Sequence, residues 1–307
     1  MKTRWIHIAA PLILIALIAA PALWQRGVDE DALTDDFYLT QDQTDPFAQI
    51  PLQAKSAYVY DVRTGNVLYE KNAELQFPLA SVAKIMTALV AIEHASANDT
   101  LSINRHALLP EGDSGFRIGE KWNIKNMIDM TLVSSSNDGA RALASVGSFP
   151  GENMDASTEE RFVNAMNEKA RKLGLAQTYF LNESGLDESA SISGGYGSAR
   201  DIGTLLSYVL QSHPNLMEAT AYNSVSIQSS DGVHTTQNTN KALDRIPGIV
   251  ASKTGFTDLA GGNLAIALEA GPLRPIIVVV LGSTEEGRFD DVANLTNAAI
   301  VKIGQVK

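Results

Sequence analysis

Strand-like segments lie near both ends of the folded part of this chain, and this distribution strongly constrains its fold. Residues 56–60 and 67–70 flank an Arg-Thr-Gly-Asn turn, which predicts a β-hairpin. Residues 264–269 and 275–281 are also short and apolar, so they predict two further strands. The first and last segments are expected to share one sheet. This predicts an α+β fold, with an antiparallel sheet from both chain ends and an inserted helical lobe.

The stretch between these segments shows apolar residues at helical spacing. The clearest example follows Ser81, which stands where an N-cap or first turn would be, and it continues to Ile92. The middle of the chain is therefore predicted to be helical. Further helices are predicted at residues 124–133, 138–146, 159–173 and 198–211, and an amphipathic helix at 290–303.

The N-terminus has the features of an export signal. Lys2 and Arg4 precede an apolar run over residues 5–23. Residues 1–26 therefore predict either a signal peptide, cleaved after Ala22 between small residues, or an uncleaved membrane anchor. Because the cationic end stays inside, both readings place the rest of the chain outside the cytoplasm, in the periplasm or on the cell-wall side.

The next segment is acidic. Residues 27–49 contain no Lys or Arg and show no apolar periodicity, so they predict a solvated linker. The globular domain is then expected to comprise residues 50–307.

Composition excludes several kinds of site. The formal net charge of -11 and the lack of a basic run argue against a nucleic-acid partner. Cysteine is absent, which removes disulfides, thiolate nucleophiles and sulfur-bound metals. Arg200 precedes Asp201 and predicts a structural ion pair, while Arg274 is a further cation that could assist a substrate. No metal or other cofactor is expected, because the histidines show no paired ligand spacing: His7, His94, His106, His213 and His234.

Three short motifs follow in the order Ser81-Val-Ala-Lys84, Ser135-Ser-Asn137 and Lys253-Thr-Gly255. In the first, Ser81 and Lys84 are three positions apart and share one helical face. A neutral lysine could accept the serine proton, and burial together with a second cation such as Lys253 would favour that form. The helix start would also direct N–H groups at a developing oxyanion. Because the pattern is common, a helix cap with an exposed lysine is the alternative.

The second motif joins two predicted helices. The Ser135 hydroxyl could relay a proton between Lys84 and a leaving amine, and the Asn137 amide could hold a substrate carbonyl. Ser, Asn and Asp also cap helices, so an ordinary capping role is the alternative. Asp138 is assigned to that structural role.

The third motif predicts a strand edge within residues 250–257. Gly255 would leave room for a ligand to approach the backbone. Lys253 and Thr254 offer a cation and a hydroxyl to a terminal carboxylate, and the Phe256 N–H is a candidate second oxyanion donor. Since Lys-Thr-Gly is also ordinary turn material, a solvated loop is the competing interpretation.

With these motifs, residues 54–282 resemble the penicillin-binding serine D-alanyl-D-alanine carboxypeptidases, low-molecular-mass penicillin-binding proteins with a β-lactamase/transpeptidase-like fold. The resemblance implies that residues 50–307 are a peptidase domain that removes the terminal D-alanine from peptidoglycan stem peptides and is acylated by β-lactams. It implies Ser81 as the acylated nucleophile, Lys84 as its base and Phe256 as an oxyanion donor. Ser135 and Asn137 would form the second element of the site, and Lys253, Thr254 and Gly255 the third. Other similar segments are 78–87, 162–170, 182–187, 198–201, 238–240 and 253–258.

Two further functions stay open. The chain ends about 25 residues after Gly282, a layout similar to that of D-alanyl-D-alanine endopeptidases, which cut peptidoglycan cross-links. A non-hydrolysing module that binds the wall or senses β-lactams is the third possibility. Class A β-lactamases share the motifs, but they use a loop glutamate to activate the deacylating water. Neither Glu168 nor Glu183 matches their Glu-x-x-Leu-Asn pattern, so stable acylation by penicillins is expected.

Overall fold

The structure, a computed structural model, describes residues 45–108, 112, 114–146 and 157–305. The predicted signal peptide or anchor (residues 1–26) lies outside these ranges, as does most of the predicted acidic linker. Within the described ranges, every helix is too short or too polar to cross a membrane.

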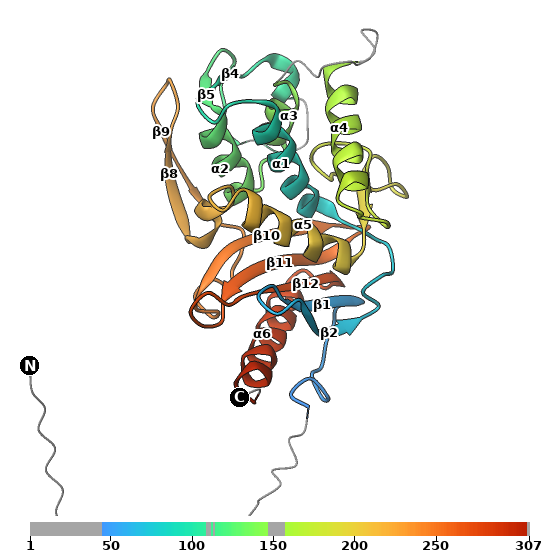
Figure 1. The fold of residues 1–307 in the computed structure, drawn as a ribbon. Helices are drawn as coiled ribbons and strands as arrows, with labels where there is room; N and C mark the ends of the chain where they lie inside the picture. Colours follow the sequence, from blue (N-terminus) through green and yellow to red (C-terminus); the bar gives the residue numbers. More distant parts are fainter. Residues whose placement is uncertain (1–44, 109–111, 113, 147–156, 306–307) are drawn as a thin grey trace, which may run out of the picture. The chain divides into compact units, whose positions relative to one another are not determined.

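Five antiparallel strands form the central sheet, in the order β10-β11-β12-β1-β2 (Figure 1). Strands from the beginning and the end of the folded chain lie side by side, because β1 pairs with β12. The predicted α+β arrangement is thereby confirmed. The strands are β1 (Ser56–Asp61), β2 (Asn66–Lys71), β10 (Ile249–Thr257), β11 (Gly261–Glu269) and β12 (Pro275–Ser283).

Successive residues of the central strands face two separate hydrophobic cores. In β12, Ile277 belongs to the core beneath the helices of the middle segment, whereas Ile276 belongs to the core that contains α6 (Gly287–Gln305). Helix α5 (Ala199–Ser212) packs on the face opposite α6 (Figure 1). Because both faces are covered, these strands are continuously apolar rather than alternating.

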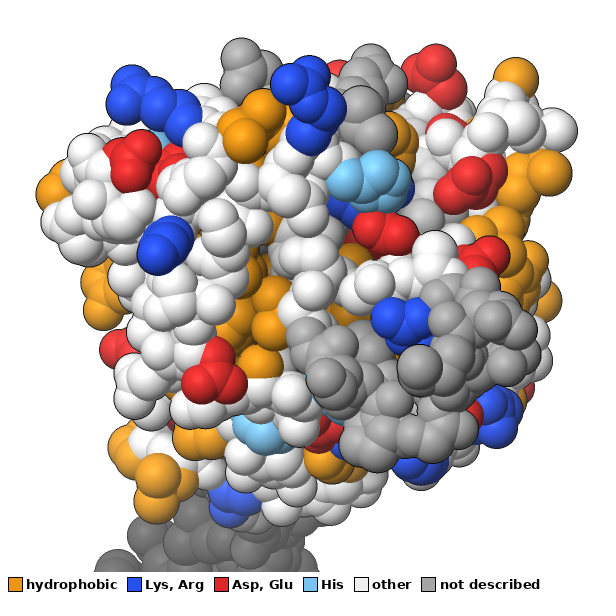
Figure 2. Space-filling model, turned by 90° about the horizontal axis from the view of Figure 1, so that it is seen from above, with side chains coloured by type: hydrophobic (Ala, Val, Ile, Leu, Met, Phe, Trp, Pro, Cys, Tyr) orange, Lys and Arg blue, Asp and Glu red, His pale blue; other side chains and the backbone are white. Residues whose placement is uncertain are grey.

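The predicted helical lobe consists of four helices above the sheet (Figure 1). On the face of the molecule shown in Figure 2, acidic and basic side chains are interspersed. The N-terminal eight residues of α1 are all buried, which makes it the central helix of the lobe. The four helices are α1 (Lys84–His94), α2 (Ile124–Ser134), α3 (Asn137–Ala144) and α4 (Thr158–Lys172).

Side-chain caps explain where three of these helices begin. The side chains of Asn123 and Ser136 accept backbone N–H groups at the starts of α2 and α3. Ser157 and Glu160 form a reciprocal capping box at the start of α4. These residue types are enriched at N-caps, and the observed helix starts lie within about two residues of the predicted ones.

Several short elements were not predicted, because each is too short to show a hydrophobic period. They are β3 (Phe77–Pro78), η2 (Ala80–Ala83), β4 (Thr100–Ser102), η3 (Arg105–Leu108), β5 (Lys121–Asn123), β6 (Tyr179–Phe180), β7 (Gly195–Gly197), η4 (Glu218–Ala221), β8 (Ser224–Gln228) and β9 (Val233–Gln237). The short strands pair among themselves in three small sheets, β3-β7-β6, β4-β5 and β8-β9.

Residues 45–49, which the sequence assigns to the acidic linker, include one residue that packs into the folded domain. Phe47 is buried in the core that contains α6, and its ring stacks on Tyr69 with 5.0 Å between centroids. A single aromatic residue in a polar stretch gives no periodic signal, so its burial could not be read from the sequence.

The two arginines considered as auxiliary cations have structural partners. Arg200 forms the predicted structural ion pair, and its partner is Glu70 of β2 rather than its neighbour Asp201. The Asp201 carboxylate instead accepts the hydroxyl of Thr178 at 2.8 Å. Arg274 donates to Asp61 at the base of the β1–β2 turn.

Candidate active site

Ser81 lies in η2, a 3₁₀ helix of one turn. Helix α1 continues directly from that turn, and Lys84 is its first residue. Lys84 Nζ is 2.7 Å from Ser81 Oγ. The three-residue spacing thus places the amine against the hydroxyl. Ala80, immediately before Ser81, has φ 47°, a conformation that costs energy for a residue with a Cβ.

The Lys84 amine is completely buried and has three oxygen neighbours. Besides Ser81 Oγ, these are Asn137 Oδ1 at 2.8 Å and the Ser184 carbonyl at 2.7 Å. A neutral amine has two N–H donors and one lone pair. The amide and carbonyl oxygens can only accept, so they take the two N–H groups, and the lone pair is left for the serine hydroxyl. The same three contacts also suit the ammonium form of Lys84. The side chain can therefore gain and lose a proton in this position.

Burial lowers the pKa of Lys84 from 10.5 to about 7, and the Glu183 carboxylate partly opposes this shift. A substantial fraction of the amine is therefore neutral near pH 7. Desolvation disfavours the charged form of any lysine, and here it is the dominant cause.

The second motif contributes two polar side chains from the junction of α2 and α3: Asn137 contacts the Lys84 amine, and Ser135 contacts the amine of Lys253. Ser135 follows α2 in the left-handed conformation, with φ 61°. Its hydroxyl accepts from Lys253 Nζ at 2.8 Å. Asn137 begins α3, and Ser136 between them caps that helix. Asp138 accepts the Ser114 N–H at 3.1 Å, a contact within the scaffold of the site.

The third motif lies on β10, at one edge of the central sheet. Lys253 and Thr254 are both almost fully buried, and the hydroxyl of Thr254 is 2.5 Å from that of Thr239. Burial, and then the neighbouring cations Lys84 and Arg288, lower the pKa of Lys253 well below its ordinary value. Burial and these neighbouring cations therefore disfavour the charged form of Lys253, and an anion bound beside it would offset that cost.

Gly255 is required by packing rather than by a ligand alone. A Cβ at this position would lie 2.8 Å from the Leu79 carbonyl oxygen and 3.1 Å from the Val82 N–H nitrogen. The absence of a Cβ at Gly255 allows β10 to pack closely against η2. On the opposite side of this peptide, Arg288 Nη1 donates to the Gly255 carbonyl at 2.6 Å. Phe256, the next residue, is 43% exposed and lines a groove.

That groove has a volume of about 700 Å³ and lies beside the motifs. One wall comes from the end of β10 and the turn after it, and the other from the segment after the 182–185 turn. Asn137 also lines the groove, and its side chain contacts Lys84. Its lining residues include Gly112, Asn137, Leu186, Asp187, Phe256 and Asp258.

Sequence reasoning missed two groups that shape the site. The buried amide of Asn263 donates to the carbonyls of Pro78 and Leu79 and accepts the Gly282 N–H. It thereby ties the segment before Ser81 to the sheet. An Asn inside an apolar strand was the available signal. The Ser184 carbonyl, in contrast, is a backbone atom and leaves no mark on the sequence.

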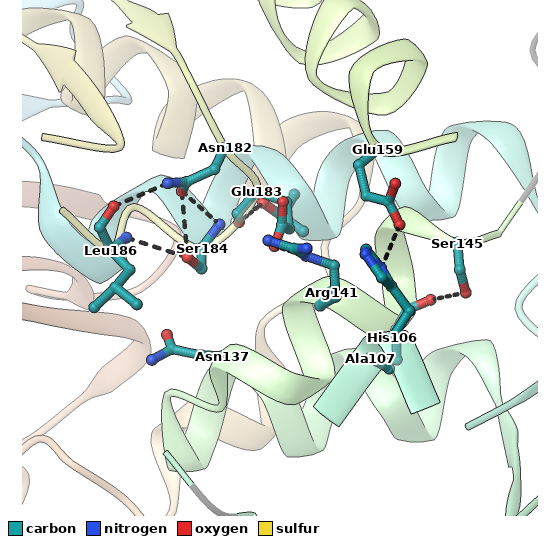
Figure 3. Close-up of polar contacts among 12 residues, drawn as sticks. His106, Ala107, Asn137, Arg141, Ser145, Glu159, Asn182, Glu183, Ser184 and Leu186 are labelled. Carbon is teal, nitrogen blue, oxygen red and sulfur yellow. Dashed lines mark hydrogen bonds and ion pairs between the residues drawn. The ribbon is translucent and has the colours of Figure 1, made fainter. Parts of the chain in front are cut away.

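The two glutamates considered as β-lactamase-like bases are both committed elsewhere. Glu168 is exposed on α4 beside Arg171. Glu183 is buried and accepts from Arg141 Nε at 2.6 Å (Figure 3). Within the described ranges, no group of three or more His, Asp or Glu side chains is arranged to hold a metal ion.

Comparisons with known proteins agree with this geometry. A family described as D-alanyl-D-alanine carboxypeptidase matches residues 41–285. D-alanyl-D-alanine carboxypeptidase DacF of Bacillus subtilis is 31% identical over 258 residues, which are 82% of this chain but 63% of that relative. A D-alanyl-D-alanine endopeptidase of Pseudomonas aeruginosa is 30% identical over 249 residues, 77% of this chain and 76% of that relative.

A solved structure is also similar. Penicillin-Binding Protein D2 from Listeria monocytogenes, in its ampicillin-bound form, matches with a TM-score of 0.68 and 29% identity over 81% of this chain and 98% of that one. The predicted transpeptidase-like fold is confirmed by this likeness.

Proposed function

Because the chain belongs to the D-alanyl-D-alanine carboxypeptidase family, we propose that it removes the terminal D-alanine from peptidoglycan stem peptides through an acyl-enzyme on Ser81. The contact that carries this proposal is the 2.7 Å approach of the buried Lys84 amine to the Ser81 hydroxyl. It supplies a nucleophile together with a base that is partly neutral near pH 7.

Acylation begins with proton transfer from Ser81 Oγ to the lone pair of Lys84 Nζ. Oγ then attacks the carbonyl carbon of the penultimate D-alanine, and the oxyanion accepts from the N–H groups of Ser81 and Phe256. The close packing of β10 on η2 supports this assignment, since it brings both backbone segments to one place. The C–N bond breaks, and the leaving amine takes up the proton that Lys84 had accepted, relayed through the Ser135 hydroxyl, so that Lys84 is neutral again.

The terminal carboxylate of the substrate binds Lys253 and Thr254. Its charge stabilises the ammonium form of Lys253, which burial disfavours, and this favours a substrate with a free C-terminus. Asn137 orients the acyl part of the peptide in the groove. Water then attacks the Ser81 ester while Lys84 accepts a proton from it. The bond between the acyl carbon and Ser81 Oγ breaks, Oγ takes the proton back from Lys84, and the shortened stem peptide leaves.

Endopeptidase action on cross-linked peptides is the second candidate. The groove beside Phe256 is open to solvent, and the Pseudomonas aeruginosa relative bears that name. A non-hydrolysing module is less favoured, because all three motifs are intact in the sequence. The first two functions share the acyl-enzyme, and they differ in the amine that leaves.

The proposed substrate places the domain outside the cytoplasm. Residues 1–26 would export it as a signal peptide or attach it to the membrane through residues 5–23, and residues 27–44 would act as a tether. The charge pattern of the sequence supports this location.

Labelled penicillin and defined muropeptides test the proposal. The ampicillin-bound Listeria relative supports the expectation that a β-lactam acylates this chain. We expect labelled penicillin to attach covalently to the native protein and not to Ser81→Ala. Ser145→Ala, at the half-buried residue that ends α3, is the matched control and should be labelled normally. Mass spectrometry should then show release of D-alanine from pentapeptide monomers. Equal labelling of Ser81→Ala would disprove the nucleophile, and cleavage of cross-links alone would favour the endopeptidase.

A further inference from the structure

A closed ring of contacts connects the Lys84 amine to a buried ion pair behind it. Lys84 Nζ contacts Asn137 Oδ1 at the start of α3, and Arg141 lies one helical turn further on the same face. Arg141 Nε donates to Glu183 Oε1 at 2.6 Å. Glu183 is followed by Ser184, whose carbonyl returns to Lys84 Nζ at 2.7 Å. Figure 3 shows Arg141 and Glu183 pointing toward each other, with Asn137 on the same helix as Arg141.

The turn that carries Glu183 is held rigidly against the nucleophile's segment. The Glu183 carbonyl accepts the Thr87 hydroxyl of α1, so two consecutive carbonyls of the turn bind α1. Asn182 Oδ1 accepts the Gly185 N–H at 2.7 Å. The Glu183 side chain is 1% exposed, whereas that of Arg141 is 24% exposed. A carboxylate this deeply buried requires a cation, and without one it would push the turn out of place.

We propose that Glu183 and Arg141 are positioning residues for the base: their ion pair holds the Ser184 carbonyl and Asn137 on two sides of Lys84, and its charge sets how readily that amine gives up its proton. This inference rests on the proposed role of Lys84 as the base. Neither residue touches the reacting atoms, so both act through Lys84.

The sign of the electrostatic effect follows from Coulomb's law. The Glu183 carboxylate stabilises the ammonium form and raises the pKa of Lys84. The Arg141 cation opposes this effect. Because the carboxylate is the more buried partner, water screens it less and its influence is expected to prevail.

Other charged groups also face Glu183. Glu159 and Glu160 of α4 and Glu188 of the following segment line the 370 Å³ hollow beside it, and His106 of η3 contacts Glu159 at 3.0 Å. These groups are unchanged in the variants below. Their contribution therefore cancels when the variants are compared with the native protein.

The test measures how the rate constant for acylation by labelled penicillin depends on pH. Three proteins are compared: the native chain, Glu183→Gln, and the double variant Glu183→Gln with Arg141→Gln. Glutamine keeps the size of Glu183 and an oxygen that can accept from Arg141. We expect the midpoint of the acid limb to be highest in the native protein, lower in the double variant and lowest in Glu183→Gln. The native and Glu183→Gln midpoints should differ by on the order of half a pH unit.

Controls separate charge from structure. Glu70→Gln removes a carboxylate that also pairs with an arginine, on β2 and away from Lys84, and it should leave the midpoint unchanged. Thermal melting checks that each variant folds. If Glu183→Gln alone does not fold, the double variant decides, because its midpoint must still lie below that of the native protein.

The possible outcomes are distinct. A purely structural role would lower the rate at every pH without moving the midpoint, and that result, or a midpoint in Glu183→Gln at or above the native one, would overturn the inference. If the native protein is not acylated at Ser81, the proposed function itself fails. Normal acylation with an unmoved midpoint refutes only the role of the ion pair.

Discussion

At the scale of single residues, the site depends on keeping a lysine uncharged inside the protein. A buried ammonium without a counter-ion is costly, and Lys84 reduces that cost by losing its proton. Its three oxygen neighbours satisfy either protonation state. Replacing it by another cation would remove this property, because an arginine stays protonated at all accessible pH values.

The titration of Lys84 predicts how acylation depends on pH. The pKa of Lys84 is lowered to about 7, so the neutral base increases as pH rises through that value. The rate constant for acylation by labelled penicillin should therefore fall about tenfold for each pH unit well below 7 and level off above about 8. Stopped-flow or gel-based labelling between pH 5 and 9 measures this profile. A rate that is constant across the range would contradict Lys84 as the base.

At the scale of elements, the short turn η2 is packed between β10 and the 182–185 turn, an arrangement that we call the clamp. Both neighbours approach it through a glycine. A Cβ on Gly255 would meet backbone atoms of η2, and a Cβ on Gly185 would lie 2.0 Å from the Ala80 carbonyl oxygen. The position of Ser81 is therefore determined by backbone packing from two sides. The two packing segments, a strand and a loop, are far apart in the sequence.

This clamp can be tested with a pair of matched glycine substitutions. Gly185 and Gly174 have nearly the same positive φ, 76° and 72°, but a Cβ on Gly174 would meet open space. Gly174→Ala should lower the free energy of unfolding by about 1 kcal/mol, the cost of the left-handed conformation. Gly185→Ala should cost at least about 2 kcal/mol more, because the backbone must move.

Urea unfolding gives both free energies, and labelled penicillin reports on the site. Gly185→Ala is also expected to slow acylation, whereas Gly174→Ala should not. Equal losses of stability in the two variants would show that the turn can shift without cost, and the clamp would then be absent.

At the scale of the whole molecule, the sheet joins the two ends of the folded chain and the lobe supplies Lys84, the proposed base. The N-terminal segment contributes to this assembly before β1 begins. Asp291 of α6 accepts the backbone N–H groups of Gln53 and Ala54 at 2.9 and 2.8 Å. Phe47 fills the core between that segment and α6.

The contribution of this segment can be measured by truncation. A chain that begins at residue 45 should unfold at the same urea concentration as one that begins at residue 27. A chain that begins at residue 52 loses Phe47, and its free energy of unfolding should fall by about 2 kcal/mol, the value of burying one large aromatic side chain. Phe47→Ala in the longer chain should reproduce most of this loss. If the chain starting at 52 were equally stable, Phe47 would not belong to the folded unit.

Prediction from the sequence succeeded where a local pattern carries the information. The helices starting at Lys84 and Thr158 and the strands of the central sheet have clear periodicity or caps, and the three motifs were recognisable from their residues. It failed where the deciding contact is between distant segments. The pairing of Arg200 with Glu70 rather than its neighbour Asp201 is one example, and the burial of Phe47 is another.

What the sequence by itself determined is the set of chemical groups: a serine one turn from a lysine, a second lysine on a strand, and an α+β order of elements. These follow from residue identity and short-range spacing, which are local properties. Only the tertiary structure decided that the Lys84 amine is buried away from water and hydrogen-bonded to Ser184 and Asn137. It also decided that β10 packs closely on η2 at Gly255. Burial and long-range packing arise when distant segments meet, and the protonation of Lys84 depends on that burial.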